Sequence, residues 1–374
     1  MSPVSKLHLL TIGSLLFFAF AEASIELVRI AALPGRFGGP HPCFDANGNQ
    51  GYEVYGNAGL DQNSIDSLLI REYAGGNTFL DIRTGLVPGG VCDVGNGDND
   101  GLVDMVTLRG AESLCVYEAT APGGFLSQLV WASTDLAPGS GSYAQFCDLD
   151  RDGLPEIVTA GWDGDGVMVF ENRGDNAYAE VPFPHSHETH NVMCSFATGD
   201  FDGDSMTEVV GGTSEGDILV YECSGDDQYA RVCSLGFYPS EIEAYSHAAA
   251  NDMDRNGYPE FISVLRRWNM PADSCRIRVY EEPEHGRLVC VDSFTYSNWG
   301  YAAATGGVDG DSIDEFAVST GSDVRLFKST GPAQYEQVWL LDRGNVPWLR
   351  FFDINRDGRV ELIFTVPRDS TYIF

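Results

Sequence analysis

A nine-residue acidic segment recurs seven times along this chain of 374 residues, and its spacing constrains the fold more than any other feature. The copies begin at residues 45, 96, 148, 200, 252, 307 and 353, so successive starts are 51, 52, 52, 52, 55 and 46 residues apart. A near-constant period of about 50 residues is typical of repeat proteins whose units are propeller blades. The period predicts seven similar units and leaves no segment for a second large domain.

Each unit contains the same order of segments. A short apolar stretch leads into the acidic segment, and a β-rich stretch such as 156–160 follows at once, with two further such stretches behind it. Gly, Pro, Asn and Asp fill the gaps, and no sustained helical period occurs beyond residue 23. The sequence therefore predicts an all-β, seven-bladed propeller of four-stranded blades, formed by residues 24–374 as a single domain.

The two ends of the chain are predicted to meet in one blade. The last unit has second- and third-strand segments at 361–365 and 371–374 but no fourth. Residues 24–31 are β-rich and precede the first acidic segment at the spacing of an outer strand. Pairing of this N-terminal strand with the last blade would close the ring and remove the unpaired edges of an open array.

Positions 1, 3, 5 and 9 of the acidic segments carry oxygen-bearing side chains, as in Asp148, Asp150, Asp152 and Glu156. Oxygen ligands that converge on one point form the kind of site that Ca²⁺ prefers. EF-hand loops begin with the same spacing, but they need Glu at position 12 and flanking helices, whereas position 12 here holds residues such as Thr159. The segments are therefore interpreted as calcium loops within β-hairpins, with up to about seven ions per chain.

The predicted calcium ligands differ in charge from loop to loop. The full set is Asp45, Asn47, Asn49 and Glu53; Asn96, Asp98, Asp100 and Asp104; Asp148, Asp150, Asp152 and Glu156; Asp200, Asp202, Asp204 and Glu208; Asp252, Asp254, Asn256 and Glu260; Asp309, Asp311 and Glu315; and Asp353, Asn355, Asp357 and Glu361. The first loop has only two carboxylates, and the sixth has Gly307 at position 1. We expect these two loops to be the weakest calcium sites.

The loops resemble the FG-GAP/VCBS repeats of integrin α-subunit propellers and of many secreted bacterial proteins. Phe201, Gly203 and Gly153 stand where the D-F-x-G-D-G pattern of that family has them, and the resemblance covers all seven units. Position 6 is glycine in four loops, where it permits a sharp turn, and Gln50, Ser205 or Ser312 in the others. The resemblance implies a seven-bladed propeller with calcium loops on one face, but it does not name an activity.

Charge and the N-terminal segment restrict the partners and the location. The formal charge of −33 argues against nucleic acid, because phosphate binding requires clustered cations. Residues 1–23 are predicted to be a secretory signal peptide, with Lys6, an apolar run over 9–20 and cleavage after Ala23. That run is too short for a transmembrane helix, and no later run is long enough. We expect a secreted or cell-surface protein without membrane insertion.

Nine cysteines in an exported chain invite disulfides. Two pairs flank predicted hairpins and are candidates for bridges across adjacent strands: Cys223 with Cys233, and Cys275 with Cys290. Four others precede acidic loops on the predicted innermost strands and are interpreted mainly as buried thiols: Cys43, Cys92, Cys147 and Cys194. Cys115 has no evident mate.

The face opposite the calcium loops is the predicted ligand-binding face, as the resemblance implies. Residues just ahead of the inner strands are expected to ring the central channel there: Tyr143, His190, His247, Tyr301 and Trp348. Aromatic planes with nearby arginines suit a glycan or an anchor residue of a protein partner. The sequence is equally compatible with these side chains simply filling the mouth of the channel.

Three functional hypotheses follow. The first is an extracellular calcium-binding adhesion module for a glycan or a cell-surface protein. The second is a polysaccharide lyase or other glycan-active enzyme, in which His190 or His247 and Tyr143 or Tyr301 act as base and acid. The third is a rigid spacer in a cell-surface assembly. No nucleophile elbow, P-loop or dinucleotide motif indicates another enzyme class.

Overall fold

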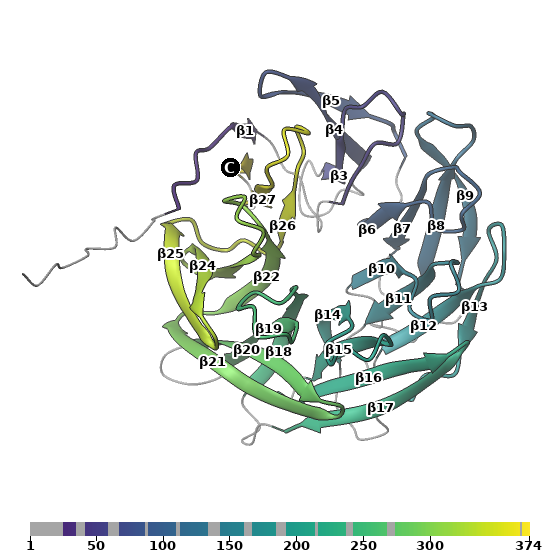
Figure 1. Ribbon diagram of the computed structural model, residues 1–374. Helices are drawn as coiled ribbons and strands as arrows, with labels where there is room; N and C mark the ends of the chain where they lie inside the picture. Colours follow the sequence, from purple (N-terminus) through teal and green to yellow (C-terminus); the bar gives the residue numbers. More distant parts are fainter. Residues whose placement is uncertain are drawn as a thin grey trace, which may run out of the picture.

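The structure is a computed structural model that describes residues 25–34, 42–58, 67–86, 89–109, 113–133, 143–160, 167–184, 192–213, 216–236, 242–267, 274–366 and 369–374. These residues form 28 strands in seven four-stranded antiparallel sheets, which are arranged as blades around a central axis (Figure 1). The described part of the chain contains no helix, so it has none that is long and apolar enough to cross a membrane. The predicted all-β, seven-bladed propeller is confirmed, and the predicted signal peptide lies outside the described residues.

Blades are numbered in chain order, and the strands of blades 1–6 follow the chain from the central axis outward (Figure 1). Blade 1 comprises β2 (Cys43–Phe44), β3 (Glu53–Ala58), β4 (Ser67–Gly75) and β5 (Thr78–Arg83). Blade 2 comprises β6 (Gly90–Gly95), β7 (Asp104–Leu108), β8 (Leu114–Ala119) and β9 (Leu126–Ala132). Blade 3 comprises β10 (Tyr143–Cys147), β11 (Glu156–Ala160), β12 (Val167–Asn172) and β13 (Tyr178–Val181).

The remaining blades repeat this order. Blade 4 comprises β14 (Val192–Gly199), β15 (Thr207–Thr213), β16 (Ile218–Gly225) and β17 (Gln228–Leu235). Blade 5 comprises β18 (Ile242–Ala249), β19 (Glu260–Arg267), β20 (Ser274–Glu284) and β21 (Arg287–Ser297). Blade 6 comprises β22 (Gly300–Gly306), β23 (Glu315–Thr320), β24 (Val324–Gly331) and β25 (Gln334–Leu341). Blade 7 comprises β26 (Leu349–Phe352), β27 (Glu361–Thr365), β28 (Ser370–Ile373) and β1 (Ala31–Pro34).

The core lies between the faces of neighbouring blades. Strands β7, β11, β15, β23 and β27 are buried at every residue. One apolar cluster joins Val106 of blade 2 to Ile157 of blade 3, and another joins Val210 of blade 4 to Phe261 of blade 5. A strand that is covered on both faces carries a continuous apolar run, which explains the β-branched stretches after each acidic segment.

The N- and C-terminal strands close the ring, but the N-terminal strand lies further along the chain than predicted. β1 pairs antiparallel with β28, with Ala31 opposite Ile373 and Pro34 opposite Ser370 (Figure 1). Of the predicted strand 24–31, only Ala31 belongs to β1, although Ile30 N–H also donates to the Ile373 carbonyl (2.9 Å). The antiparallel register pairs residues 31–34 with residues 373–370, and the hydrogen bond from Ile30 extends this pairing by one residue.

A buried arginine in blade 1 holds both outer strands of blade 7. Arg71 is 1% exposed, and its Nη1 donates to Thr371 Oγ1 on β28 (2.8 Å) and to the Leu33 carbonyl on β1 (3.4 Å). Its Nε donates to Asp81 within blade 1 (3.2 Å). One guanidinium therefore links blade 1 to both strands that close the ring.

We expect Arg71→Met to lower the free energy of unfolding by about 2–3 kcal/mol, because hydrogen bonds from a charged donor to two strands of blade 7 are lost. Asp81 is half exposed and can be hydrated in the variant, which limits the cost. Denaturant unfolding measures the difference. The matched control is Arg287→Met, whose arginine side chain is 64% exposed, and equal effects of the two substitutions would contradict the linking role of Arg71.

The predicted cross-strand disulfides are wrong. Cys223 lies opposite Tyr229 and Cys233 opposite Val220, while Cys275 lies opposite Tyr296 and Cys290 opposite Tyr280. None of these four thiols is in a disulfide. The hairpins are longer than expected and contain register shifts, which separate the two members of each pair along the strands.

The prediction for the innermost cysteines agrees with the structure where it is described. Cys43 and Cys92 are buried, and burial raises the pKa of each thiol to about 12. Cys147 is half-buried, and burial raises the pKa of its thiol to about 11. The side chain of Cys194 lies outside the described residues. The described inner cysteines therefore behave as small packing residues rather than as reactive thiols.

Candidate metal loops

Each acidic loop connects the first and second strands of its blade, and the loops are numbered as their blades. The position-9 carboxylate is the first residue of the second strand in six blades and the second residue, Glu208 of β15, in blade 4, and its exposure is at most 5% in all seven loops. One of its oxygens accepts the backbone N–H of position 2 at 2.5–2.9 Å. The bonds run from Ala46 to Glu53, Gly97 to Asp104, Leu149 to Glu156, Phe201 to Glu208, Met253 to Glu260, Val308 to Glu315 and Ile354 to Glu361. This bond holds the start of each loop against its end.

Every loop contains two residues in the left-handed backbone region, at positions 4 and 6. Position 4 has φ of 60–78° and position 6 has φ of 69–99°. In each loop one of the two is glycine and the other is not. Glycine stands at position 4 in loops 1, 4 and 6 (Gly48, Gly203, Gly310) and at position 6 in loops 2, 3, 5 and 7 (Gly101, Gly153, Gly257, Gly358). The second turn at position 4 was not predicted, although this exchange of glycine between the two positions is visible in the sequence.

Ser205→Gly is expected to stabilise the protein by about 0.5–1 kcal/mol. The left-handed conformation costs a non-glycine residue about 1–2 kcal/mol, which exceeds the extra chain entropy that glycine loses on folding. Ser205 has φ of 74°. Chemical denaturation of the metal-loaded protein measures the change. The control is Ser293→Gly in β21, an exposed serine in extended backbone, where glycine is expected to destabilise.

The structure brings predicted ligands together around single points. Asp148, Asp150, Asp152 and Glu156 of loop 3 each offer an oxygen, and these atoms lie within 4.8 Å of one another. The same holds for three predicted ligands of loop 4 (Asp200, Asp202, Glu208) and three of loop 5 (Asp252, Asp254, Glu260). Asp204 instead groups with Asp202, Glu222 and His285. Convergent carboxylates of this kind match the donor set of a hard cation.

Buried oxygens without hydrogen-bond partners test whether a cation fits. Among the described residues, the second oxygen of the position-9 carboxylate accepts no hydrogen bond in Glu53, Asp104, Glu156, Glu208 and Glu315, although the ammonium group of Lys328 lies 3.4 Å from that of Glu315. In loop 3, Asp148 and Asp150 each also have one buried oxygen that accepts no hydrogen bond. Buried carboxylate oxygens are costly unless they are paired or coordinate a metal. The loops therefore fit a bound cation.

The same burial perturbs the acidity of the position-9 carboxyls. Removal from water raises the pKa of Glu156 and Glu208 to about 8, and of Glu53 and Asp104 to about 7. Neighbouring carboxylates raise these values further, while the bond from the position-2 N–H opposes the shift. A metal-free loop is thus expected to retain a proton near neutral pH, and a bound cation would displace it.

The stability of the chelator-treated protein is expected to fall as pH rises from about 5 to about 8. In this range the folded loops still hold protons, whereas unfolded glutamates have lost theirs near pH 4.3, so the folded state is favoured at the lower pH. Calcium replaces those protons, and the loaded protein should show a much weaker slope. Thermal unfolding across this pH range measures both. Equal slopes with and without calcium would contradict the assignment.

A glutamate on the third strand, missed in the sequence, faces each of the first five loops. The register places Glu72, Glu118, Glu222 and Glu281 directly opposite the position-9 carboxylate. In blade 3, Ile157 lies opposite Phe170, so the next residue, Glu171, lies opposite Glu156. Glu171 is 1% exposed and has an oxygen without a hydrogen-bond partner among the described residues. The signal was present as an aromatic residue followed by Glu at 117–118, 170–171, 221–222 and 280–281.

The loops also lie at the junctions between blades, because the outer hairpin of the following blade reaches back to them. Asn176 of blade 3 donates from its N–H to Asp98 (2.8 Å) and from Nδ2 to Glu118 (2.7 Å) in blade 2. His285 Nδ1 of blade 5 lies 3.0 Å from both Asp202 and Glu222 in blade 4. A cation held in a loop would therefore act on two blades.

Loop 6 differs from the others. Its three predicted ligands, Asp309, Asp311 and Glu315, all face the ammonium group of Lys328. In loop 7, Glu361 Oε1 accepts a hydrogen bond from Asn355 Nδ2 (2.7 Å), and the arginine at position 4, Arg356, reaches across to Asp45 of loop 1 (2.7 Å). The predicted ligands thus converge, but their partners vary around the ring.

The residues predicted for the opposite face occupy different environments. Tyr143 of blade 3 and Trp348 of blade 7 stack across the channel, with ring centroids 6.0 Å apart and planes at 24°, and both are half-buried. Tyr301 is half-buried at the start of blade 6. His247 is 4% exposed, and burial lowers its pKa to about 3, so it is neutral. His190 lies outside the described residues. The stack between Tyr143 and Trp348 supports the interpretation that large side chains fill the channel.

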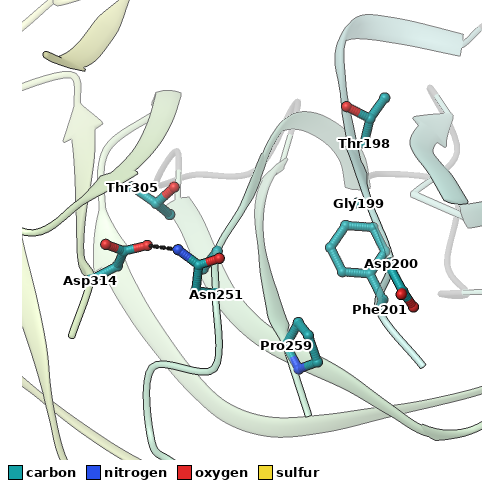
Figure 2. A pocket seen from close by; sticks show the side chains of 9 residues that line it. Thr198, Gly199, Asp200, Phe201, Asn251, Pro259, Thr305 and Asp314 are labelled. Carbon is teal, nitrogen blue, oxygen red and sulfur yellow. Dashed lines mark hydrogen bonds between the residues drawn. The ribbon is translucent and has the colours of Figure 1, made fainter. Parts of the chain in front are cut away.

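A pocket of about 340 Å³, which was not predicted from the sequence, lies beside the acidic loops of blades 4–6. Figure 2 shows Asn251 and Asp314 pointing toward each other on one side, joined by a hydrogen bond of 2.8 Å, and the ring of Phe201 on the other. Thr198, Thr305 and Asp200 also line it. These groups can bind a small polar ligand through hydroxyl, amide and carboxylate contacts.

Comparison with known proteins agrees with this architecture. The FG-GAP-like repeat family matches residues 148–211, which contain loops 3 and 4. No curated protein sequence matches the chain. Among solved structures, Sqt1 of Saccharomyces cerevisiae is similar, with a TM-score of 0.53 over 92% of this chain and 96% of that chain. Its identity of 11% shows the fold alone. The chain is therefore a seven-bladed β-propeller with FG-GAP-like repeats over residues 148–211.

Proposed function

We propose that this protein is a secreted, calcium-stabilised propeller that acts as an extracellular binding module for a glycan or a cell-surface protein. The observation that carries the calcium assignment is the recurrence of one buried carboxylate per loop, with an oxygen that accepts no hydrogen bond in loops 1–4 and, beside Lys328, in loop 6. Repeat number, ligand spacing and the FG-GAP match all support the same assignment.

Bound calcium would act on both charge and geometry. The chain carries a formal charge of −33, and much of its acidity is concentrated in the loops, where carboxylates repel one another. In loop 3 the side chains at positions 1, 3, 5 and 9 would hold the ion, and in loop 4 those at positions 1, 3 and 9, with Glu171 or Glu222 adjacent on the third strand. Calcium binding is therefore coupled to folding, because the unfolded chain has no preformed cage.

A binding role follows from what the fold offers once the loops are fixed. Rigid blades carry irregular connections at both ends of the channel, and such connections on a rigid scaffold are frequent binding surfaces. The pocket beside loops 4–6 has the polar lining that a glycan hydroxyl or a polar side chain of a protein requires. The extracellular setting rests on the predicted signal peptide and on the preference of such loops for millimolar calcium.

The lyase hypothesis stays a prediction with little geometric support. His247 is buried and neutral, and Tyr143 stacks on Trp348 while its hydroxyl donates to Gln145 Oε1 (3.2 Å). Burial also raises the pKa of Tyr143 well above its usual range, which makes its hydroxyl a weaker acid. We therefore favour binding over catalysis.

Calcium removal is expected to lower the melting temperature markedly. Each site filled at about 100 times its Kd contributes about 2.7 kcal/mol to stability. Glu156→Gln should remove one such contribution in calcium and have little effect in chelator, because the neutral amide matches the protonated acid. Glu284→Gln, at a side chain that is 70% exposed, is the control. Scanning calorimetry in calcium and in chelator measures the effect of calcium removal and of each substitution. A melting temperature that does not change on chelation would contradict the metal assignment.

Ligand binding is expected to depend on calcium and on the channel face opposite the loops. The calcium-loaded protein, applied to a broad glycan array, should lose a selective signal on chelation and in Trp348→Ala. Asn251→Ala alters the pocket on the loop side and serves as the matched variant. Loss of the signal in Asn251→Ala but not in Trp348→Ala would indicate that the ligand binds in that pocket. Absence of binding to any glycan on the array would favour a protein partner.

A further inference from the structure

Loop 6 has the conformation of the other loops but not their chemistry. Its backbone is the same: Val308 N–H donates to Glu315 (2.9 Å), and Gly310 and Ser312 have left-handed φ of 76° and 69°. Position 1, however, is Gly307, which has no side-chain oxygen. The loop therefore keeps its shape with one ligand fewer.

A lysine stands where blades 1–5 carry glutamate. Phe316 of β23 lies opposite Phe327 of β24. Because the strands are antiparallel, the next residue of β24, Lys328, lies opposite Glu315 at position 9. Glu72, Glu118, Glu171, Glu222 and Glu281 occupy the equivalent place in blades 1–5. The exchange replaces a negative charge beside the loop with a positive one.

The ammonium group of Lys328 contacts all three carboxylates of its loop. Nζ donates to Asp309 and to Asp311 Oδ2 (2.7 Å), and it lies 3.4 Å from Glu315 Oε1. The Lys328 side chain is 21% exposed and Glu315 is fully buried. The ammonium group of Lys328 therefore lies at the centre of loop 6, between its three carboxylates.

We infer that Lys328 is the cation of loop 6 and that this loop forms without calcium. A divalent ion bound by the same three carboxylates would lie within a few ångströms of the ammonium group, where like charges repel strongly in a partly buried site. A cation supplied by the chain is present at any calcium concentration. Loop 6 is then independent of metal, whereas the other loops depend on calcium. Only this difference between loop 6 and the other loops rests on the proposed function.

The first test removes the built-in cation without involving metal. Lys328→Gln is expected to lower the melting temperature by the same amount in chelator and in calcium. Glu156→Gln, in contrast, is expected to lower the melting temperature only in calcium. Arg287→Gln, at an exposed arginine, controls for loss of a surface charge. A Lys328→Gln variant as stable as Arg287→Gln in chelator would overturn the inference, whether or not the other loops bind calcium.

The second test converts loop 6 into a calcium loop. Gly307→Asp with Lys328→Glu gives it the carboxylates that loops 3 and 4 carry at positions 1, 3, 5 and 9 and on the third strand. After equilibrium dialysis against calcium, metal analysis should show one more bound ion per chain than in the unmodified protein. Equal stoichiometry, with the variant shown to be folded by circular dichroism, would mean that loop 6 already binds calcium. Absence of calcium from the unmodified protein would refute the proposed function but leave the first test intact.

Discussion

The buried position-9 carboxylate is the constraint on which the loops and the blade junctions depend. One oxygen of each closes the loop by accepting the N–H of position 2, and this bond recurs in all seven blades. The other oxygen faces the loop, where water is excluded and the adjacent carboxylates, such as Asp150 beside Glu156, carry the same charge. A cation, a hydrogen-bond donor or a proton must therefore be present at each of these points for the folded ring to be stable.

The placement of the loops between blades extends this local requirement to the whole ring. The core of the propeller consists of contacts between neighbouring blades, and the polar contacts follow the same interfaces. Asn176 joins blade 3 to the loop of blade 2, and Arg71 joins blade 1 to both strands that close blade 7. Charge in one loop thus bears on the stability of two blades.

Loop 6 indicates that this fold specifies a positive charge rather than one particular ion. The backbone turns of loop 6 and its bond to position 2 are the same as in the other loops, although the ammonium group of Lys328 lies among its carboxylates. His285 lies 3.0 Å from both Asp202 and Glu222 at another junction, and its pKa is raised mainly by its hydrogen bond with Asp202. The repeat can therefore diverge at single third-strand or hairpin positions without losing its fold.

The sequence by itself determined the all-β class, the seven blades, the closure by the chain ends and the convergence of acidic side chains within nine residues, because all of these follow from local patterns and a regular period. It did not determine which residues from other strands face those loops. Lys328, the third-strand glutamates, the start of β1 at Ala31 and the separation of Cys223 from Cys233 all depend on strand register. Register is set by hairpin length, bulges and packing between blades, which only the tertiary structure decides.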